Sequence, residues 1–355
     1  MPRRLLSAAL VGSLSLTLAA APAEAGQTSL RFLGEQIVPN ALTYEGTTVG
    51  GLSSVDYDQR TGQFVFVSDD RSALQPARFY TAKFSVTSNG LGPVSFTGTS
   101  PFRQADGTTY PVNSVDPEEL RVDPRSGDYY WTQEGERTAT TLLDPSLREA
   151  KRDGTYVRDL PIPDNERMLP DSGPRQNLVL EGLTFAAGGS LLVSALEGPL
   201  LEDGPLATTE QGQTSRITVQ SRSGRIFGQY AYEQEPLFAA GTGGSTGVSS
   251  ILAVDATHYY VLERSFVSGA GNKVRIYEID LAGATNVLGK SLADAKPVRK
   301  KLVADLAGYP LSKVDNIEGM TWGPKLPDGR RTLILVSDNN FSASQITQVV
   351  AFAVR

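Results

Sequence analysis

The chain has 355 residues with no cysteine and one histidine, and its formal net charge is −6 at pH 7. These counts exclude disulfides, cysteine nucleophiles, histidine acid phosphatases and zinc sites that need several histidines. The acidic balance makes nucleic acid and anionic membranes poor partners and makes cations good ones.

The N-terminus has the pattern of a secretory signal. Two arginines precede an apolar run from Leu5 to Ala21, and small residues at Ala23 and Ala25 stand where a signal peptidase reads. The run is too short and too rich in alanine and serine for a transmembrane anchor, and no later segment is apolar enough to span a bilayer. We therefore expect a signal peptide over 1–25, cleavage near Ala25, an extracellular or periplasmic location, and a single domain over 26–355.

A strand–turn–strand unit recurs along the rest of the chain. Its segments are short, rich in valine, leucine and aromatic residues, and bounded by glycine, proline and aspartate. A near-constant period of such units is typical of a β-propeller, so we predict an all-β fold. The apolar anchors of five copies lie 68, 63, 68 and 69 residues apart, at Leu52, Leu120, Leu183, Ile251 and Met320.

The spacing of the anchors bears on the number of blades. A four-stranded blade usually takes roughly 40 to 50 residues, so either each blade carries long loops or a degenerate blade lies between the legible copies. We expect six blades, with 298–311 contributing to the degenerate one. The segment 30–38 precedes the first copy as an unpaired strand, and we expect it to complete the last blade and close the ring. The turns 58–62 and 123–127 are interpreted as structural hairpin loops.

Acidic residues occupy two places in the repeats. Glutamate begins the first strand of three copies, at Glu118, Glu181 and Glu318. An acid ends the second strand of all five copies, at Asp69, Glu134, Glu197, Glu263 and Asp338. These two places are neighbours in an antiparallel hairpin, so the symmetry of the ring predicts that all eight carboxylates converge at one mouth of the channel. An alternative interpretation is that they are ordinary polar residues of turns.

Converging carboxylates indicate a metal. Like charges in one site raise each other's pKa unless a cation neutralises them. Carboxylate oxygens are the ligands that calcium prefers, and the chain lacks a soft ligand set for zinc or copper. We therefore expect Ca²⁺ to be bound by these eight acids, with magnesium and manganese as open alternatives.

Basic residues follow the acids in three copies, at Arg71, Arg137 and Arg264. If these arginines share the mouth, they can bind an anionic substrate beside the metal; otherwise they pair with the acids and balance their charge. His258 stands where a turn enters a strand, and no Gly-x-Ser-x-Gly motif accompanies it. We therefore interpret it as a turn residue rather than the base of a serine hydrolase.

The ordered motifs resemble the "esterase-like activity of phytase" family, whose domains are also called phytase-like. The resemblance rests on Gly-Gly-Leu-Ser and Phe-Val-Ser-Asp-Asp-Arg within 50–71, Asp-Pro-Glu-Glu-Leu at 116–120, Glu-Gly-Leu-Thr at 181–184, Val-Leu-Glu-Arg-Ser at 261–265, and Asn-Ile-Glu-Gly-Met-Thr with Val-Ser-Asp-Asn-Asn within 316–340. It implies a secreted propeller with an acidic site, distantly similar to β-propeller phytases, which use several calcium ions to bind and hydrolyse phosphomonoesters. The chain departs from the family pattern at Gly50, Glu119 and Ser249.

The first functional hypothesis is a calcium-dependent hydrolase of phosphomonoesters or related esters. In it the acids hold the metal, Glu134 or Glu263 acts as general base, and Arg71, Arg137 and Arg264 bind the phosphate. One alternative is a non-catalytic secreted propeller with structural calcium that binds a protein or glycan. Another is a metal-dependent lactonase or carboxylesterase that uses the same mouth. We expect a monomer whose partner is a small ester or phosphate ester, without nucleic acid and without a membrane span.

Overall fold

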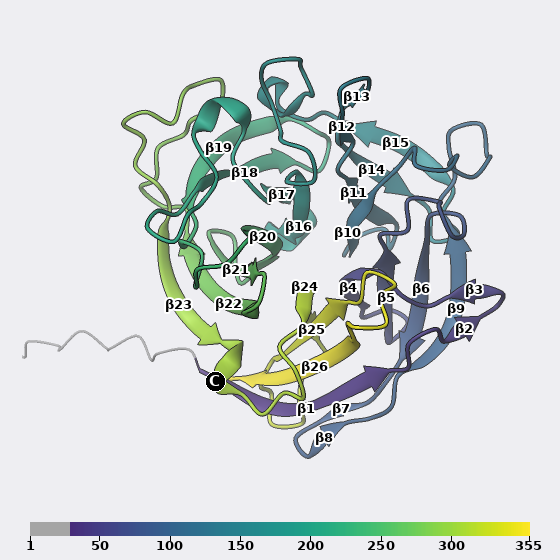
Figure 1. Cartoon of the computed structure of the whole chain (residues 1–355). Helices are drawn as coiled ribbons and strands as arrows, with labels where there is room; N and C mark the ends of the chain where they lie inside the picture. Colours follow the sequence, from purple (N-terminus) through teal and green to yellow (C-terminus); the bar gives the residue numbers. More distant parts are fainter. Residues whose placement is uncertain (1–28) are drawn as a thin grey trace, which may run out of the picture.

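Residues 29–355 are described by the computed structural model, and their strands form five four-stranded antiparallel sheets arranged as a ring around a central channel (Figure 1). Each sheet is one blade of a β-propeller, as the repeats predicted. The signal peptide expected over 1–25 lies outside the described residues. Within them, no helix has the length and apolar character needed to cross a membrane.

The blades follow one another along the chain, and each runs from an innermost strand at the channel to an outer strand. From the channel outward, the strands are β4 (Leu52–Asp58), β5 (Gln63–Ser68), β6 (Arg78–Lys83) and β9 (Ser95–Pro101) in the first blade; β10 (Pro117–Val122), β11 (Tyr129–Gln133), β14 (Ser146–Ala150) and β15 (Tyr156–Leu160) in the second; β16 (Leu180–Ala186), β17 (Leu191–Leu196), β18 (Thr214–Ser221) and β19 (Ile226–Glu233) in the third; β20 (Gly244–Ala253), β21 (His258–Val267), β22 (Gly271–Asp280) and β23 (Arg299–Asp305) in the fourth; and β24 (Asn316–Gly323), β25 (Thr332–Asp338), β26 (Thr347–Val354) and β1 (Leu30–Val38) in the fifth.

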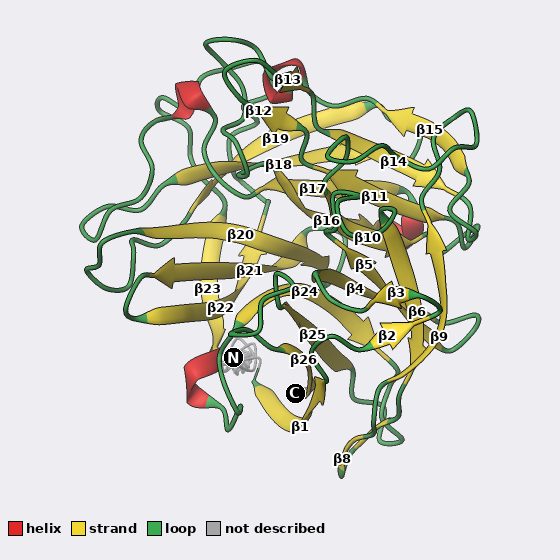
Figure 2. Ribbon diagram, turned by 45° about the vertical axis from the view of Figure 1, so that its right-hand side comes forward, coloured by secondary structure: helices red, strands yellow, loops and turns green. Residues whose placement is uncertain are grey.

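Short elements decorate the loops (Figure 2). They are the hairpins β2 (Thr43–Tyr44) with β3 (Thr47–Thr48), β7 (Val86–Thr87) with β8 (Gly90–Leu91), and β12 (Glu136–Arg137) with β13 (Leu142–Leu143), and the 3₁₀ turns η1 (Asp164–Glu166), η2 (Ala187–Gly189), η3 (Leu201–Asp203) and η4 (Leu306–Gly308). The two turns interpreted as hairpin loops have that structure, because Gly62 and Gly127 adopt φ angles of 66° and 83° and donate to the carbonyls of Asp58 and Asp123.

The expected sixth blade is absent from residues 29–355, and this prediction is corrected. The segment 298–311, expected to contribute to it, instead supplies β23, the outer strand of the fourth blade, and η4. The long period comes from loops such as 102–116 and 161–179. The fifth blade holds both ends of the described chain, because β1 pairs antiparallel with β26 from Leu30 to Val38.

The blades pack face to face, with apolar side chains filling the space between neighbours. Successive residues of β5 illustrate the consequence: Val65 packs toward the second blade with Trp131, whereas Phe66 packs toward the fifth blade with Val336. Because both faces of a blade are buried, its central strands read as continuous apolar runs rather than as alternating patterns.

Arg121 ties the innermost strands together inside the channel. From β10, its guanidinium donates to Leu183 O on β16 at 2.6 Å, to Val55 O on β4 at 3.2 Å and to Ile251 O on β20 at 3.3 Å. Glu119 balances its charge at 3.0 Å, and both side chains are buried. One residue thereby links four of the five innermost strands, which stabilises the ring from within.

Candidate functional site at the channel mouth

Each innermost strand carries a β-bulge at the same level. A bulge leaves one residue without a partner in the ladder and re-aims its side chain. The extra residue comes from the same place in every copy, namely Ser53, Glu118 (with Glu119), Glu181, Ser249 and Glu318. The three glutamates line the cavity at this mouth. The structural counterpart of these glutamates in the first copy is Ser53, rather than Gly50 as the sequence comparison had it.

A second ring of residues stands beside the first, at the end of the second strand of each blade. In three blades the backbone N–H of this residue donates to the carbonyl of the residue just before the innermost strand: Asp69 to Gly51, Glu134 to Asp116 and Glu197 to Val179, at 2.7 to 3.1 Å. In the fourth and fifth blades the same level holds Arg264, opposite Gly247, and Asp338, opposite Asn316. The ring therefore contains four acids and one arginine.

Glu263 does not belong to the mouth, contrary to the sequence prediction. It lies one residue before the mouth position, which Arg264 occupies, and neighbouring side chains of a strand point to opposite faces. Its carboxylate turns between the third and fourth blades, where Lys300 Nζ lies 2.6 Å from it and the Tyr232 hydroxyl donates to it at 2.5 Å. Its predicted roles as metal ligand and general base are therefore corrected.

The three arginines have separate environments. Arg71 lines the cavity, and its guanidinium lies 3.4 Å from Asp116 and 3.5 Å from Glu136. Arg137 instead donates three hydrogen bonds of 2.6 to 2.7 Å to carbonyls of the loop 161–179. Arg137 is not among the cavity-lining residues, so the structure assigns it to holding that loop and corrects its predicted contact with substrate.

Arg264 is the cation at the centre of the acids. Its Nη2 donates to Glu197 at 3.0 Å, and its Nε lies 3.4 Å from Glu318, so it bridges the third and fifth blades. His258, by contrast, begins β21 at the end opposite to Arg264, where its Nδ1 lies 3.1 Å from Asp255. The histidine is therefore remote from the mouth.

The mouth encloses a cavity of about 1120 Å³. Six of the predicted ligands line it, namely Asp69, Glu118, Glu181, Glu197, Glu318 and Asp338. Glu134 is buried beside them, with ligand atoms close to those of Glu118, Glu181 and Glu197. The structure thus brings seven of the eight acids together, although their role as ligands stays a prediction.

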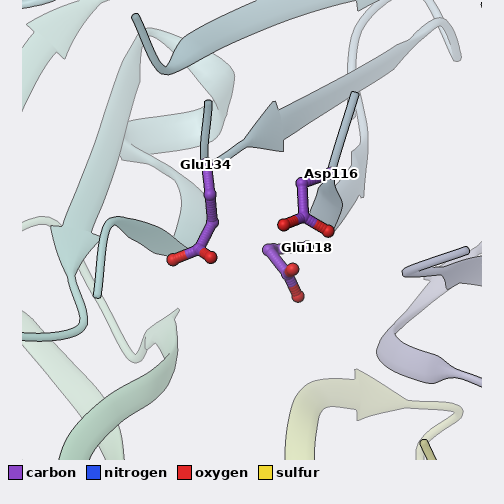
Figure 3. Close-up of side chains that lie close together, drawn as sticks. All are labelled: Asp116, Glu118 and Glu134. Atoms are coloured by element: carbon purple, nitrogen blue, oxygen red, sulfur yellow. The ribbon is translucent and has the colours of Figure 1, made fainter. Parts of the chain in front are cut away.

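Asp116 is a further acid of the site that the sequence analysis did not single out. Its carboxylate points toward those of Glu118 and Glu134 (Figure 3). The Asp-Pro-Glu spacing of Asp116 and Glu118 could have predicted this, because residues two apart in an extended chain share one side. The equivalent positions of two other copies are Gly51 and Gly247.

Two glycines make room for the carboxylates. A Cβ atom on Gly51, whose φ is 59°, would collide with Asp69 Oδ1, and a Cβ on Gly247 would collide with the Glu197 side chain. At these positions the backbone itself forms the wall against which the acids rest.

Burial raises the pKa of Asp116 and of the seven predicted acids that meet at the mouth. Loss of contact with water is the largest cause throughout. The raised pKa is about 6 for Asp116, about 7 for Glu197 and Glu318, and about 8 for Asp338. Repulsion from neighbouring carboxylates adds to burial and holds the pKa well above its ordinary value at Asp69, Glu118, Glu134 and Glu181. These groups therefore carry more negative charge than the two arginines balance once they ionise.

Comparison with known protein families finds a match over most of the chain. The family model described as phytase-like, esterase-like activity of phytase, matches residues 47–341. The chain belongs to this phytase-like family. No curated protein shows a significant match to it.

Solved structures similar to this phytase-like chain have low sequence identity. The periplasmic gluconolactonase PpgL of Pseudomonas aeruginosa has 11% identity and a TM-score of 0.37, over 87% of this chain and 89% of that chain. A hypothetical protein from Leishmania major has 9% identity and a TM-score of 0.42, over 90% of each chain. The Cps50 (Swd1) β-propeller domain of Myceliophteria thermophila has 11% identity and a TM-score of 0.36, over 92% of this chain and 100% of that chain.

The phytase-like mouth has a donor set that fits calcium. Two overlapping triads, Asp116–Glu118–Glu134 and Glu134–Glu181–Glu197, each offer carboxylate oxygens that lie within 4.8 Å of one another. Two oxygens bound to one calcium ion lie up to about 5 Å apart, because each Ca–O distance is about 2.4 Å. Glu134 Oε1 accepts from Val179 N at 2.7 Å, whereas no hydrogen-bond donor within residues 29–355 reaches its buried Oε2. This oxygen is therefore available to accept a hydrogen bond from water or to bind a cation.

Proposed function

We propose that this phytase-like propeller hydrolyses phosphomonoesters and that the reaction depends on divalent cations, calcium above all, bound at the mouth. The observation that carries the proposal is the pair of triads that share Glu134, with one buried carboxylate oxygen left without a partner. Membership of the phytase-like family supports a hydrolase. The eight carboxyl groups with raised pKa values repel one another when they ionise, and bound cations would offset this repulsion.

The chain offers places for two cations. Asp116, Glu118 and Glu134 would hold one, and Glu134, Glu181 and Glu197 would hold the other. When bound there, calcium would neutralise the carboxylates and supply a Lewis acid for the oxygens of the ester. Within the two buried triads, Glu118 and Glu181 project from the bulges of β10 and β16, and Glu134 and Glu197 directly follow β11 and β17.

Other residues of the mouth have roles of their own. Arg71 and Arg264 line the cavity from the first and fourth blades and present guanidinium donors to an anionic group. Glu318 and Asp338 belong to neither triad, and Asn316 Nδ2 donates to both, at 3.0 and 3.3 Å. With Asp69, they are the general-base candidates for an attacking water, because these three acids line the cavity outside both triads, whereas Glu263 lies elsewhere and Glu134 belongs to both triads.

A pair of matched glutamates tests the proposal. Glu134→Gln keeps the shape of the side chain but removes a charge from both triads, so calcium-dependent release of phosphate from 4-nitrophenyl phosphate and phytate is expected to fall about 100-fold or more. Glu166→Gln is the control, because Glu166 is equally buried and also has an unpartnered Oε2, yet it lies against Thr218 and Gln229. Equal activity in the two variants, or none in the calcium-loaded wild type, would refute the proposal.

A metal-dependent lactonase or carboxylesterase is the second candidate. Both arginines of the cavity already pair with carboxylates, Arg71 with Asp116 and Arg264 with Glu197, and a neutral substrate would leave these pairs intact. Arg71→Ala separates the candidates. A phosphatase is expected to lose activity, whereas hydrolysis of a lactone or acetate ester is expected to be unchanged.

We also propose that the protein works outside the cytoplasm, after removal of 1–25. The arginine pair, the apolar run and the small residues at Ala23 and Ala25 support this location. N-terminal sequencing of the protein from the extracytoplasmic fraction tests it. A mature chain that begins near Gly26 is the expected result, and an intact Met1 in the cytoplasmic fraction would contradict it.

A further inference from the structure

The strands of the fourth blade extend further at the mouth than those of the other blades. β20, β21 and β22 are each ten residues long, whereas the first three strands of the other blades have five to eight residues (Figure 2). The extension lies on the side of the mouth, because β21 continues past Arg264 to Val267 before the chain turns into β22. We call residues 244–246, 265–267 and 271–273 the blade-4 wall.

The blade-4 wall turns a polar and aromatic row toward the cavity. Ser245, Phe266 and Asn272 are direct neighbours across its three strands, and all three line the cavity. The residues on either side of Phe266 in the chain, Ser265 and Val267, are buried, whereas Phe266 is 42% exposed. The back of the wall is therefore packed against the fold, and its front presents a phenyl ring to the cavity.

Phe266 lies a short distance along β21 from Arg264, the charged residue of that strand at the mouth. Phe266 and Arg264 are two residues apart on β21, so their side chains leave the strand on the same face, about 7 Å apart along it. Arg264 contacts Glu197 and Glu318 at the level of the carboxylates. Phe266 therefore stands about two residues beyond the level of the carboxylates on the same face, where an apolar group attached next to an ester bound at the acids would lie.

We propose that Phe266 is a specificity residue that selects esters whose alcohol carries a flat apolar ring next to the ester group. This inference rests on the proposed hydrolase function. Stacking on an exposed phenyl ring removes apolar surface of both partners from water, and aromatic pairs gain further from their electrostatic arrangement. The rigid wall has already lost its conformational freedom, so little entropy opposes the contact.

Folded proteins also expose single apolar residues that line no cavity. Phe227 is such a residue. It lies on β19, the outer strand of the third blade, is 44% exposed, and is not part of the cavity lining. It provides the matched control for Phe266.

The experiment compares benzyl phosphate with ethyl phosphate, whose leaving alcohols have similar acidity, on calcium-loaded mature protein. Wild type is expected to favour the benzyl ester about tenfold or more in kcat/KM. Phe266→Ala is expected to bring this ratio near one by lowering the rate on the benzyl ester, with ethyl phosphate and the melting temperature unchanged. Phe227→Ala is expected to keep the wild-type ratio.

A binding measurement separates this inference from the proposed function. Benzylphosphonate and ethylphosphonate are not hydrolysed, and their affinities for the same three proteins can be compared by calorimetry. A benzyl preference that disappears in Phe266→Ala supports the inference even if no ester is turned over, in which case only the proposed function fails. Turnover with an unchanged ratio in Phe266→Ala, or no binding of benzylphosphonate to wild type, overturns the inference.

Discussion

The buried charges of single residues fall into two kinds, those with a protein partner and those without one. Glu263 has partners: Lys300 Nζ lies 2.6 Å from it, and the ring of Tyr277 lies 4.1 Å from the same Nζ. Lys300→Met would leave the Glu263 carboxylate buried without its counter-charge, so the free energy of unfolding is expected to fall by about 3–5 kcal/mol. Urea unfolding measures this change. Lys301→Met, at the exposed neighbouring position, is the control and is expected to change little.

The same residue shows where sequence reasoning fails at this scale. The repeats correctly indicated that acids end the second strands, and seven of the eight acids do meet. The prediction that Glu263 lies at the mouth was wrong because a one-residue error in register moves a side chain to the opposite face of the strand. The acid beside Arg264 matched the repeat pattern better than Arg264 itself. Asp116 could have been predicted from the sequence, because it stands two residues before Glu118.

The β-bulge of each innermost strand is the element that builds the mouth, and in the third and fifth blades a glycine, Gly182 or Gly319, follows the bulged residue. A Cβ on Gly319 would lie 2.8 Å from Ser54 Cα and 2.9 Å from Val55 N, both backbone atoms of the adjoining blade. Gly319→Ala is therefore expected to lower the free energy of unfolding by about 1–3 kcal/mol. Thermal and urea unfolding check this expectation. Gly243→Ala, which meets nothing within 4 Å, is the control, and equal losses in both variants would contradict the packing argument.

The second copy shows how the bulge tolerates a departure from the glycine pattern. Glu119 occupies the glycine position there, and its side chain turns into the channel, where Arg121 and Ser250 donate to its Oε2 at 3.0 and 2.8 Å. Sequence patterns located the five bulged strands through their apolar anchors. They did not predict the bulges themselves, because these arise from the packing of innermost strands around a narrow channel.

At the scale of the whole molecule, the mouth makes stability depend on pH. Four of its carboxyl groups, Asp116, Glu197, Glu318 and Asp338, have folded-state pKa values of about 6 to 8, above the ordinary values near 4, so between pH 4 and 8 the folded chain holds more protons than the unfolded chain. Stability therefore falls as pH rises through this window. Chelator-treated protein is expected to melt at a lower temperature at pH 8 than at pH 5, and calcium is expected to remove most of the difference. A melting temperature that rises with pH without calcium would contradict this account.

The overall architecture was legible from the sequence, whereas the blade count was not. Strand–turn–strand units with apolar anchors 63 to 69 residues apart identify a propeller, because each unit buries its two faces against its neighbours. The length of the connecting loops is free of that constraint, so the period did not distinguish five blades with long loops from six blades. The segment 298–311 has the composition of a strand, and only its pairing as β23 with β22 assigns it to the fourth blade.

The proposed function requires calcium to bind at the mouth, and equilibrium binding of calcium to chelator-treated mature protein measures this property. The two triads predict two ions bound per chain, both weakened in Glu134→Gln because that residue serves both triads, and both retained in Glu166→Gln. Undiminished binding in Glu134→Gln would place the ions elsewhere. If wild type binds no calcium, magnesium or manganese, the carboxylates of the mouth are not a metal site, and the proposed metal-dependent reaction is contradicted.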